Sequence, residues 1–241
     1  MPSDEAVRKA AIKFVKKNKK LIISRFADLT KFPPSQNPFT LFMAGSPGAG
    51  KTEFSISLIK QLSEKDLNTK VVRIDADEIR DIIPQYDKTN SNLLQSAAAI
   101  GVEKLFDYVQ AHAQNVVVDG TFANYEVALK DVKRALGKNR KVGIIYLYQD
   151  PAIAWDFTKK REKLEGRVVP KEMFIQAFLN SKENVNKIKK EFGNGVRLSL
   201  VIKNFENRVE KTLFNIDTVD SYLKVKYNPQ TLRGILDDKN T

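Results

Sequence analysis

Residues 42–55 read FMAGSPGAGKTEFS, a glycine-rich loop between an apolar run and a stretch of helical character. The loop fits the phosphate-loop pattern G-x-x-x-x-G-K-[ST] in full. Its glycines let the backbone curl so that N–H groups face phosphate oxygens, and the N-terminus of the following helix adds positive potential. Lys51 is expected to reach the β- and γ-phosphates, and the Thr52 hydroxyl to ligate Mg²⁺. The motif predicts binding of a nucleoside triphosphate by Gly45, Ser46, Pro47, Gly48, Ala49, Gly50, Lys51 and Thr52.

Apolar runs and helical patterns alternate along the chain after this loop. The runs that predict strands are mostly apolar on successive residues, which suits parallel strands buried on both faces; they are 39–44, 70–75, 115–119, 141–148 and 197–203. Helical patterns are found at 51–64, 78–113 (in two or more pieces), 123–137 and 151–192, the last with a break near Gly166–Pro170. The order predicts an α/β fold of the P-loop NTPase type, with a doubly wound parallel sheet of about five strands and a helical lid.

The two ends of the chain differ from this central pattern. Residues 1–38 are expected to form an N-terminal helical extension with a Pro-rich connector, 39–205 the P-loop kinase core, and 206–241 a C-terminal tail. The first twenty residues hold seven basic side chains against two acidic ones, which predicts a basic surface helix. In the tail, Pro229 is expected to interrupt any helix.

Charge and composition limit the classes of function. The 241 residues carry a formal net charge of +12, which favours anionic partners such as nucleotides, nucleic acid or an acidic protein. Cysteine is absent, so the sequence holds neither a disulfide framework nor a thiolate metal site. No stretch approaches the roughly 20 apolar residues of a membrane-spanning helix. We expect a cytoplasmic protein that does not associate with membranes.

Polar residues follow the second predicted strand, in the segment DADEIRDIIPQY. The carboxyl ends of parallel strands share one edge of the sheet, so Asp77 should lie on the same edge as the phosphate loop. A carboxylate there can accept the proton of an acceptor hydroxyl. Arg80, three residues on, should share its helix face. The alternative for Asp77 is a helix N-cap.

Two further segments carry candidate site residues. The third predicted strand ends in VVVDGTF, where Asp119 can hold Mg²⁺, as a Walker B acid does, or bind a hydroxyl of the acceptor. The sequence leaves both roles open. The stretch KKREKLEGRVVP (159–170) carries Arg161 and Arg167, and a mobile lid in small kinases places arginines here over the transferred phosphoryl group. The alternative is an exposed, charged helix end.

These segments together resemble the zeta toxin family over about residues 40–205: GSPGAGKT, DADEIRDIIPQY, VVVDGTF, KKRE and GRVVPKE. Members of that family are P-loop kinases of bacterial toxin–antitoxin systems that phosphorylate a sugar hydroxyl of nucleotide sugars, above all UDP-N-acetylglucosamine. The phosphate loop is generic, whereas the D-x-D-x-x-[KR]-x-x-x-P-x-[FY] block and the two lid arginines are more specific.

The resemblance implies a role for each matching residue. It makes Asp77 the base, Lys51 the phosphate lysine, and Arg161 and Arg167 the arginines on the transferring phosphoryl group. It places Asp119, Thr121 and, less directly, Glu103 beside the acceptor sugar. Arg80 is a candidate substrate-binding residue from its spacing to Asp77. Position 119 is aspartate where the best-known members carry glutamate, and the lid arginines are closer in sequence here. Both departures lie on the acceptor side.

Three hypotheses follow. The first is an ATP- and Mg²⁺-dependent kinase of a nucleotide sugar, acting as the toxin of a toxin–antitoxin pair with an acidic protein antitoxin. The second is a P-loop kinase of another acceptor, either NAD or a polynucleotide 5′ end; the net charge of +12 is compatible with a nucleic-acid acceptor. The third is a nucleotide-dependent binding protein without transfer activity. The set of Asp77, Arg161 and Arg167 argues against the third, because a binding switch needs neither a base nor lid arginines.

Overall fold

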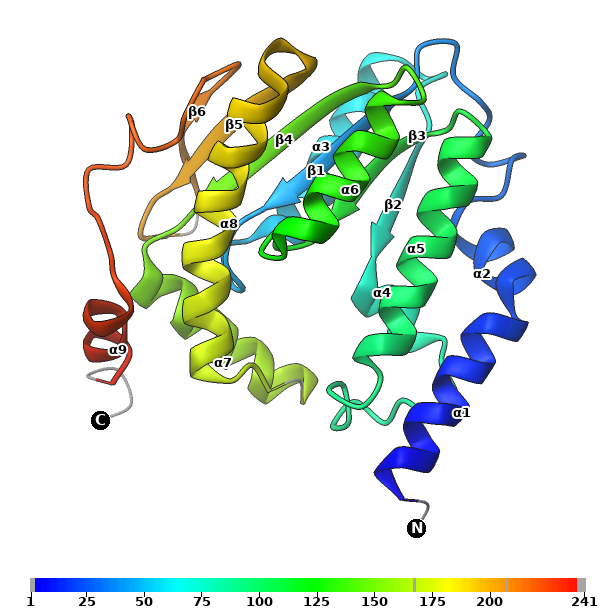
Figure 1. Cartoon of the computed structure of the whole chain (residues 1–241), viewed down its shortest axis with the longest axis horizontal. Helices are drawn as coiled ribbons and strands as arrows, with labels where there is room; N and C mark the ends of the chain where they lie inside the picture. The colour runs from blue at the N-terminus through cyan, green and yellow to red at the C-terminus, as the bar shows by residue number, and fades with distance from the viewer. Residues whose placement is uncertain (1–2, 167, 207, 238–241) are drawn as a thin grey trace.

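A computed structural model describes residues 3–166, 168–206 and 208–237 of the chain. In these ranges the centre of the molecule is a six-stranded sheet with the order β2-β3-β1-β4-β5-β6 (Figure 1). The strands are β1 Phe39–Ala44, β2 Val71–Asp75, β3 Asn115–Asp119, β4 Lys141–Tyr148, β5 Val196–Lys203 and β6 Val209–Leu213. Strands β1 to β5 are parallel, and β6 pairs antiparallel with β5. The predicted parallel sheet and its five predicted strands are confirmed.

The sixth strand was not predicted from the sequence. Val209–Leu213 reads VEKTL, and its first three side chains are exposed. An edge strand pairs on one side only and needs no continuous apolar run, so this segment lacks the signal that marks the buried strands.

Helices connect the strands in the predicted alternation. Within the described ranges they are α1 Asp4–Lys17, α2 Lys19–Phe26, α3 Lys51–Lys65, α4 Ala76–Asp81, α5 Gln95–Ala111, α6 Tyr125–Leu136, α7 Pro151–Glu165, α8 Lys171–Phe192 and α9 Pro229–Asp237, with a short 3-10 turn at Gly193–Gly195. The helical pattern predicted at 78–113 resolves into α4 and α5, separated by residues 82–94. The predicted break near Gly166 separates α7 from α8. These two helices are called the lid helices below, after the lid that the sequence predicts in this segment.

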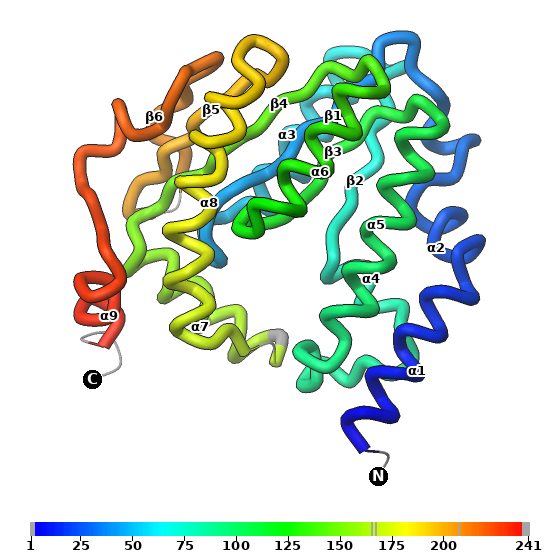
Figure 2. Tube along the Cα trace, viewed as in Figure 1, coloured from blue at the N-terminus to red at the C-terminus, as the bar shows by residue number. Residues whose placement is uncertain are grey.

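The helices are divided unequally between the two faces of the sheet. The larger apolar cluster joins one face of the strands to α1, α2, α5, α6 and α8, whereas a smaller cluster joins the other face to α3 (Figures 1 and 2). The cause is topological: the chain moves one way along the sheet from β1 to β2 and the other way afterwards, and right-handed crossovers then place the connecting helices on opposite faces. The phosphate loop lies at the start of α3 and therefore at this change of direction.

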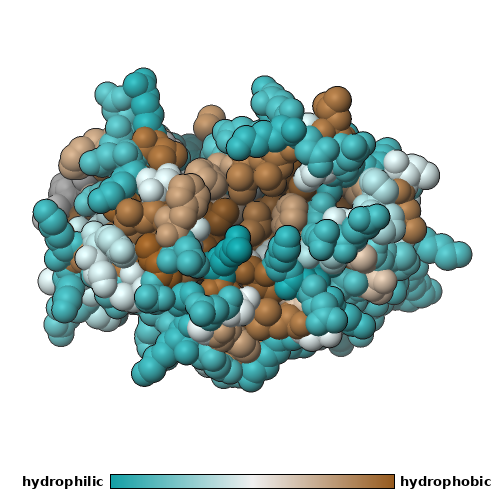
Figure 3. Space-filling model, turned by 90° about the horizontal axis from the view of Figure 1, so that it is seen from above, coloured by the Kyte–Doolittle hydropathy of each residue, from teal (hydrophilic) through white to brown (hydrophobic). Residues whose placement is uncertain are grey.

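The N-terminal segment packs on the same core. Ala11 and Val15 of α1 are fully buried and belong to the larger apolar cluster, alongside residues of α5. The helix carries acidic residues in its first turn and Lys16 and Lys17 in its last, an arrangement that suits the helix dipole. Its remaining lysines are exposed, as the sequence predicts for a basic surface helix. From above, hydrophilic side chains fill most of the rim of the molecule and apolar ones gather toward its middle (Figure 3).

The C-terminal segment corrects one expectation. Pro229 does not interrupt a helix but begins α9, because the first turn of a helix needs no N–H from proline. Leu232 and Leu236 of α9 are buried against a separate apolar cluster that includes Phe174 and Phe178 of α8. This short helix therefore packs against the lid, beside α7 and α8 (Figure 2). The division of the chain at residues 38 and 205 stays a prediction.

Candidate active site

The phosphate loop connects the end of β1 to the start of α3. Gly50 caps α3 in a left-handed conformation, with φ of 80°, so that the helix N-terminus opens toward the loop. Gly48 also has positive φ, and a Cβ there would overlap the carbonyl oxygen of Ala154 in α7. Lys51 Nζ lies inside the curve of the loop, where it donates to the carbonyl oxygen of Ser46 at 2.6 Å. The geometry is that of an anion-binding loop held against the first lid helix.

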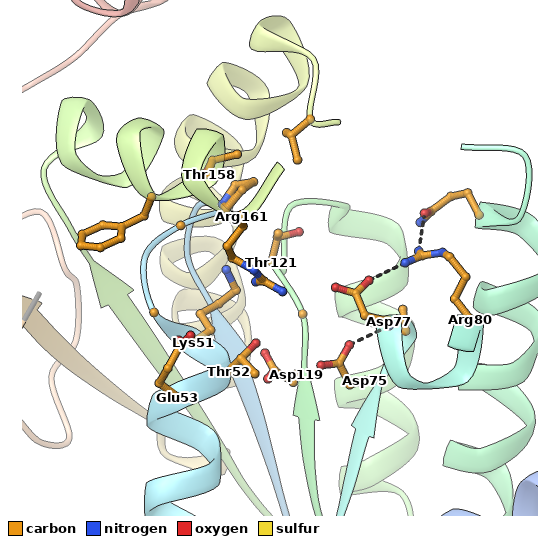
Figure 4. A pocket seen from close by; sticks show the side chains of 18 residues that line it. Lys51, Thr52, Glu53, Asp75, Asp77, Arg80, Asp119, Thr121, Thr158 and Arg161 are labelled. Atoms are coloured by element: carbon orange, nitrogen blue, oxygen red, sulfur yellow. Dashed lines mark hydrogen bonds and ion pairs between the residues drawn. The ribbon is translucent and has the colours of Figure 1, made fainter. Parts of the chain in front are cut away.

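A cavity of about 380 Å³ opens at this edge of the sheet. Figure 4 shows it with Lys51, Thr52 and Glu53 of α3 on one side, Asp77 and Arg80 of α4 on the other, and Arg161 reaching in from the lid. Most of the predicted site residues line it: Pro47, Gly48, Gly50, Lys51, Thr52, Asp77, Arg80, Asp119, Thr121 and Arg161. The structure thus brings together residues from four regions that lie far apart in the sequence: 47–52, 77–80, 119–121 and 161. Arg167 lies outside the described residues.

Asp77 is placed by α4, which begins directly at the end of β2. The N-cap of this helix is Asp75, whose Oδ1 accepts the backbone N–H of Asp77 at 2.8 Å. The capping role considered for Asp77 therefore belongs to Asp75. Arg80, one turn on, is only 1% exposed and donates from Nη1 to Asp77 Oδ1 at 2.5 Å and from Nη2 to Gln95 Oε1 at 3.1 Å. Arg80 thus fixes the carboxylate of Asp77 at the cavity wall.

Asp119 ends β3 between the two walls. It is buried, and its Oδ2 accepts from Ser55 Oγ at 3.0 Å and from Arg73 Nη2 at 2.5 Å. In the β2–β3 register Asp119 lies opposite Asp75, so two carboxylates meet at the end of neighbouring strands. Burial, and then the charge of Asp77, raises the pKa of Asp75 to about 6. The carboxylates of Asp75 and Asp119 thus meet at the floor of the cavity, and both pair with Arg73, whose side chain is 10% exposed.

A magnesium ion fits the donor side of this cavity. No cluster of three or more histidine, cysteine, aspartate or glutamate residues that could hold a metal is found within the described ranges. Thr52 and Asp119 nevertheless line the same cavity beside the phosphate loop. A hydroxyl and one carboxylate suit Mg²⁺, which keeps several waters and takes other ligands from substrate phosphates. Asp119 can serve it directly or through water.

The predicted residue Glu103 lies elsewhere. It is on α5, and its side chain is 51% exposed and pairs with Lys130 of α6 at 2.5 Å. It is not among the residues that line the cavity. No support for an acceptor-side role of Glu103 comes from its position.

No role was assigned from the sequence to several residues that the structure places in or beneath the site, among them Gln95, Arg73 and Ser55. Gln95, at the start of α5, lines the acceptor wall. Arg73 and Ser55 lie beneath Asp119. A charged residue within the apolar run KVVRID was the available signal for Arg73, whereas Gln95 and Ser55 have no comparable mark in the sequence.

Comparison with known proteins agrees with the fold and the motifs. The family model described as Zeta toxin matches residues 23–218, most of the chain. The chain belongs to the Zeta toxin family. A comparison with curated protein sequences gives no match for this Zeta toxin family member. None of its helices in the described ranges is long and apolar enough to cross a membrane.

Solved structures with a similar fold include one from a toxin–antitoxin system and one of a complex of two proteins. One is from the PezAT chromosomal toxin–antitoxin system of Streptococcus pneumoniae, with a TM-score of 0.66 and 17% identity over 94% of this chain and 96% of that one. Another is the AvrRxo1-ORF1:-ORF2 complex with ATP, with a TM-score of 0.63 and 12% identity over 95% of this chain and 84% of that one. At these identities the likeness establishes the shared α/β fold of this Zeta toxin family member.

Proposed function

We propose that this chain is a kinase that transfers the γ-phosphoryl group of ATP, with Mg²⁺, to a sugar hydroxyl of a nucleotide sugar of the UDP-N-acetylglucosamine type. In the cytoplasm it would act as the toxin of a toxin–antitoxin pair. One observation carries the proposal: the phosphate loop and the Asp77–Arg80 pair face each other across one cavity, with Arg161 between them (Figure 4). Donor and acceptor can then approach from opposite walls, as in-line transfer requires.

Each wall has a chemical role in this proposal. Asp77 accepts the proton of the acceptor hydroxyl as its oxygen forms a bond to the γ-phosphorus. The bond between that phosphorus and the β–γ bridging oxygen breaks, and ADP leaves. Lys51 and Arg161 stabilise the negative charge on the transferring group. Bound Mg²⁺, held by Thr52 with or without Asp119, would neutralise charge on the β- and γ-phosphates.

Family membership and the structural neighbours support the toxin role. The neighbour from Streptococcus pneumoniae belongs to a toxin–antitoxin system. We infer that this chain, too, is held inactive by a protein antitoxin until it is released. The departures from the family pattern lie on the acceptor side, so the experiment below compares several classes of acceptor.

The test is transfer of labelled γ-phosphate from ATP to a panel of UDP-sugars, NAD and 5′-hydroxyl oligonucleotides. We expect a labelled UDP-sugar with the wild-type chain. Asp77→Asn should lower transfer by about a hundredfold or more, the usual contribution of a general base, while ATP affinity stays at least as strong. The substituted amide keeps an oxygen for Arg80, and the cap on α4 is Asp75, so the fold should persist.

Two controls make the result specific. Lys51→Ala should abolish transfer to every acceptor, since the lysine serves the donor. If only NAD or only an oligonucleotide becomes labelled, that molecule is the acceptor, and the proposal of a nucleotide sugar is wrong. Transfer at the wild-type rate by Asp77→Asn would show that Asp77 is not the base.

A further inference from the structure

Arg73 places a cation beneath the carboxylates of the site. It lies in β2 within an otherwise apolar run, and its side chain is 10% exposed. Nη2 lies 2.5 Å from Asp75 Oδ2 and 2.5 Å from Asp119 Oδ2, and Nη1 lies 2.5 Å from Glu78 Oε1. Nε donates to Ser55 Oγ at 3.0 Å. All three guanidinium nitrogens are therefore used, each toward a different neighbour or pair of neighbours.

The partners of Arg73 lie on both the ATP side and the acceptor side of the proposed active site. Asp119 lines the cavity next to Thr52, and Ser55, one turn after Thr52 on α3, also donates to Asp119. Asp75 accepts from the backbone N–H of Asp77 and so fixes the first turn of α4. One guanidinium thus connects the phosphate-loop helix, the end of β3 and the start of the helix that carries Asp77.

We propose that Arg73 is a positioning residue for phosphoryl transfer. It holds Asp119 on the donor side and, through Asp75, the α4 turn that carries Asp77 on the acceptor side. The proposal rests on the kinase function proposed above. Without this cation, three carboxylates would meet at the end of β2 and β3 with no positive charge among them, and their mutual repulsion would move them apart. Arginine suits the place because its planar fork serves several acceptors in fixed directions, which a lysine ammonium cannot do.

The main variant is Arg73→Lys, which keeps the charge and removes the fork. Arg197→Lys is the matched control, because Arg197 is an exposed arginine near the opposite, amino-terminal end of β5. We expect Arg73→Lys to remain folded and to lower kcat by about tenfold or more, the usual cost of losing a supporting partner of a site ligand. KM for ATP should change by less than about threefold, since the phosphate loop itself is untouched. Arg197→Lys should match the wild type in both constants.

Chemical rescue separates positioning from a purely structural role. Arg73→Ala leaves a space next to the cavity that a free guanidinium ion can enter. Low-millimolar guanidinium chloride should restore a large part of the kcat lost in Arg73→Ala and should leave Arg197→Ala unchanged. A loss that only follows the fraction of unfolded protein, with full activity in the folded remainder and no rescue, would overturn the proposal.

A second readout is independent of any acceptor. The ratio of ATP affinities measured with Mg²⁺ and with EDTA reports how well the donor-side ligands are placed. Arg73→Lys should reduce this ratio measurably but by less than about threefold, the same limit as for KM, while affinity in EDTA stays close to the wild-type value. An unchanged ratio together with a wild-type kcat would also overturn the proposal. If the wild type transfers to no acceptor, the kinase proposal fails by itself, and the ratio still decides whether Arg73 places Asp119.

Discussion

At the scale of single residues, the site is built from pairs in which one side chain faces the cavity and another fixes it. Arg80 holds Asp77, and Arg73 with Ser55 holds Asp119. The supporting members are buried, so they cost more to desolvate than exposed ion pairs and depend on good geometry. The phosphate loop is also held in place by a neighbour, because Gly48 packs closely against Ala154 of α7.

The first prediction at this scale concerns that close approach. In Gly48→Ala the new Cβ would overlap the carbonyl oxygen of Ala154 and lie 2.6 Å from Thr158 Oγ1, at a φ of 71° that L side chains rarely adopt. Backbone atoms cannot yield cheaply, so the loop or α7 must shift. A shift of about 1 Å can cost about a hundredfold in rate. We expect a loss of that size in phosphoryl transfer, with weakened ATP binding measured by calorimetry.

Gly234→Ala supplies the control for Gly48→Ala. Gly234 lies in α9, and a Cβ there would meet nothing within 4 Å. Alanine in a helix should raise the free energy of unfolding by up to about 1 kcal/mol and leave transfer unchanged. Wild-type transfer by Gly48→Ala would show that the loop does not need this contact.

The sequence predicted those site residues that are close to one another along the chain, within one motif or on one helix face. Lys51 and Thr52 follow from the loop motif, and Arg80 follows from its spacing to Asp77 on one helix face. The roles of Arg73 and Ser55 depend on the β2–β3 register and on the face of α3 that packs against it, neither of which a motif shows. Glu103 was expected near the acceptor from family resemblance alone, and the rotation of α5 turns it toward Lys130 instead.

At the scale of elements, the buried strands and the long helices could be predicted from the sequence. The edge strand β6 and the C-terminal helix α9 were not predicted. Most of the strands from β1 to β5 are apolar on successive residues because both faces of the sheet are covered there. β6 is short and has no continuous apolar run, whereas α9 is amphipathic but was not predicted because Pro229 was expected to interrupt a helix there. β6 is stabilised by pairing with β5, and α9 by packing against α7 and α8, and no local sequence signal reports these contacts.

The prediction at the element scale is that α9 supports the lid. Leu232 is fully buried among the residues that join α7, α8 and α9, and Arg233 of α9 pairs with Glu172 of α8 at 2.8 Å. Leu232→Ala should lower the free energy of unfolding by about 2–5 kcal/mol, measured by denaturant titration. Because Arg161 lies on α7, we also expect a lower kcat in the protein that remains folded.

Gln230→Ala is the control for Leu232→Ala. Gln230 lies on the same helix with an exposed side chain, so its loss removes no packing. The variant should differ from the wild type by no more than about 0.5 kcal/mol. If Leu232→Ala is destabilised but retains the wild-type kcat when folded, α9 stabilises the molecule without supporting the lid.

At the scale of the whole molecule, the outer surface and the cavity differ in their balance of positive and negative charge. The chain carries a formal net charge of +12, while the cavity is lined by both acidic and basic side chains, namely Glu53, Asp75, Asp77, Asp119, Lys51, Arg80 and Arg161. The excess of positive charge therefore lies on the outer surface, and part of it on the exposed lysines of α1. Such a surface attracts anionic partners from a distance, whereas the cavity selects what binds near the reacting atoms.

The last prediction follows from this distribution. A protein inhibitor of this chain should be acidic and should cover the nucleotide cavity, because the surface is basic and the cavity is the point at which inhibition is complete. Its association rate, measured by stopped flow, should fall by about tenfold or more as salt is raised from low to high concentration, since ions screen steering over distances beyond roughly 10 Å. Changing Lys13, Lys16 and Lys17 to glutamine should slow association at low salt and flatten the salt dependence, whereas changing them to arginine should do neither. An inhibitor whose association ignores ionic strength, or that leaves ATP binding intact, would contradict this prediction, because neither long-range attraction nor coverage of the cavity would then explain its action.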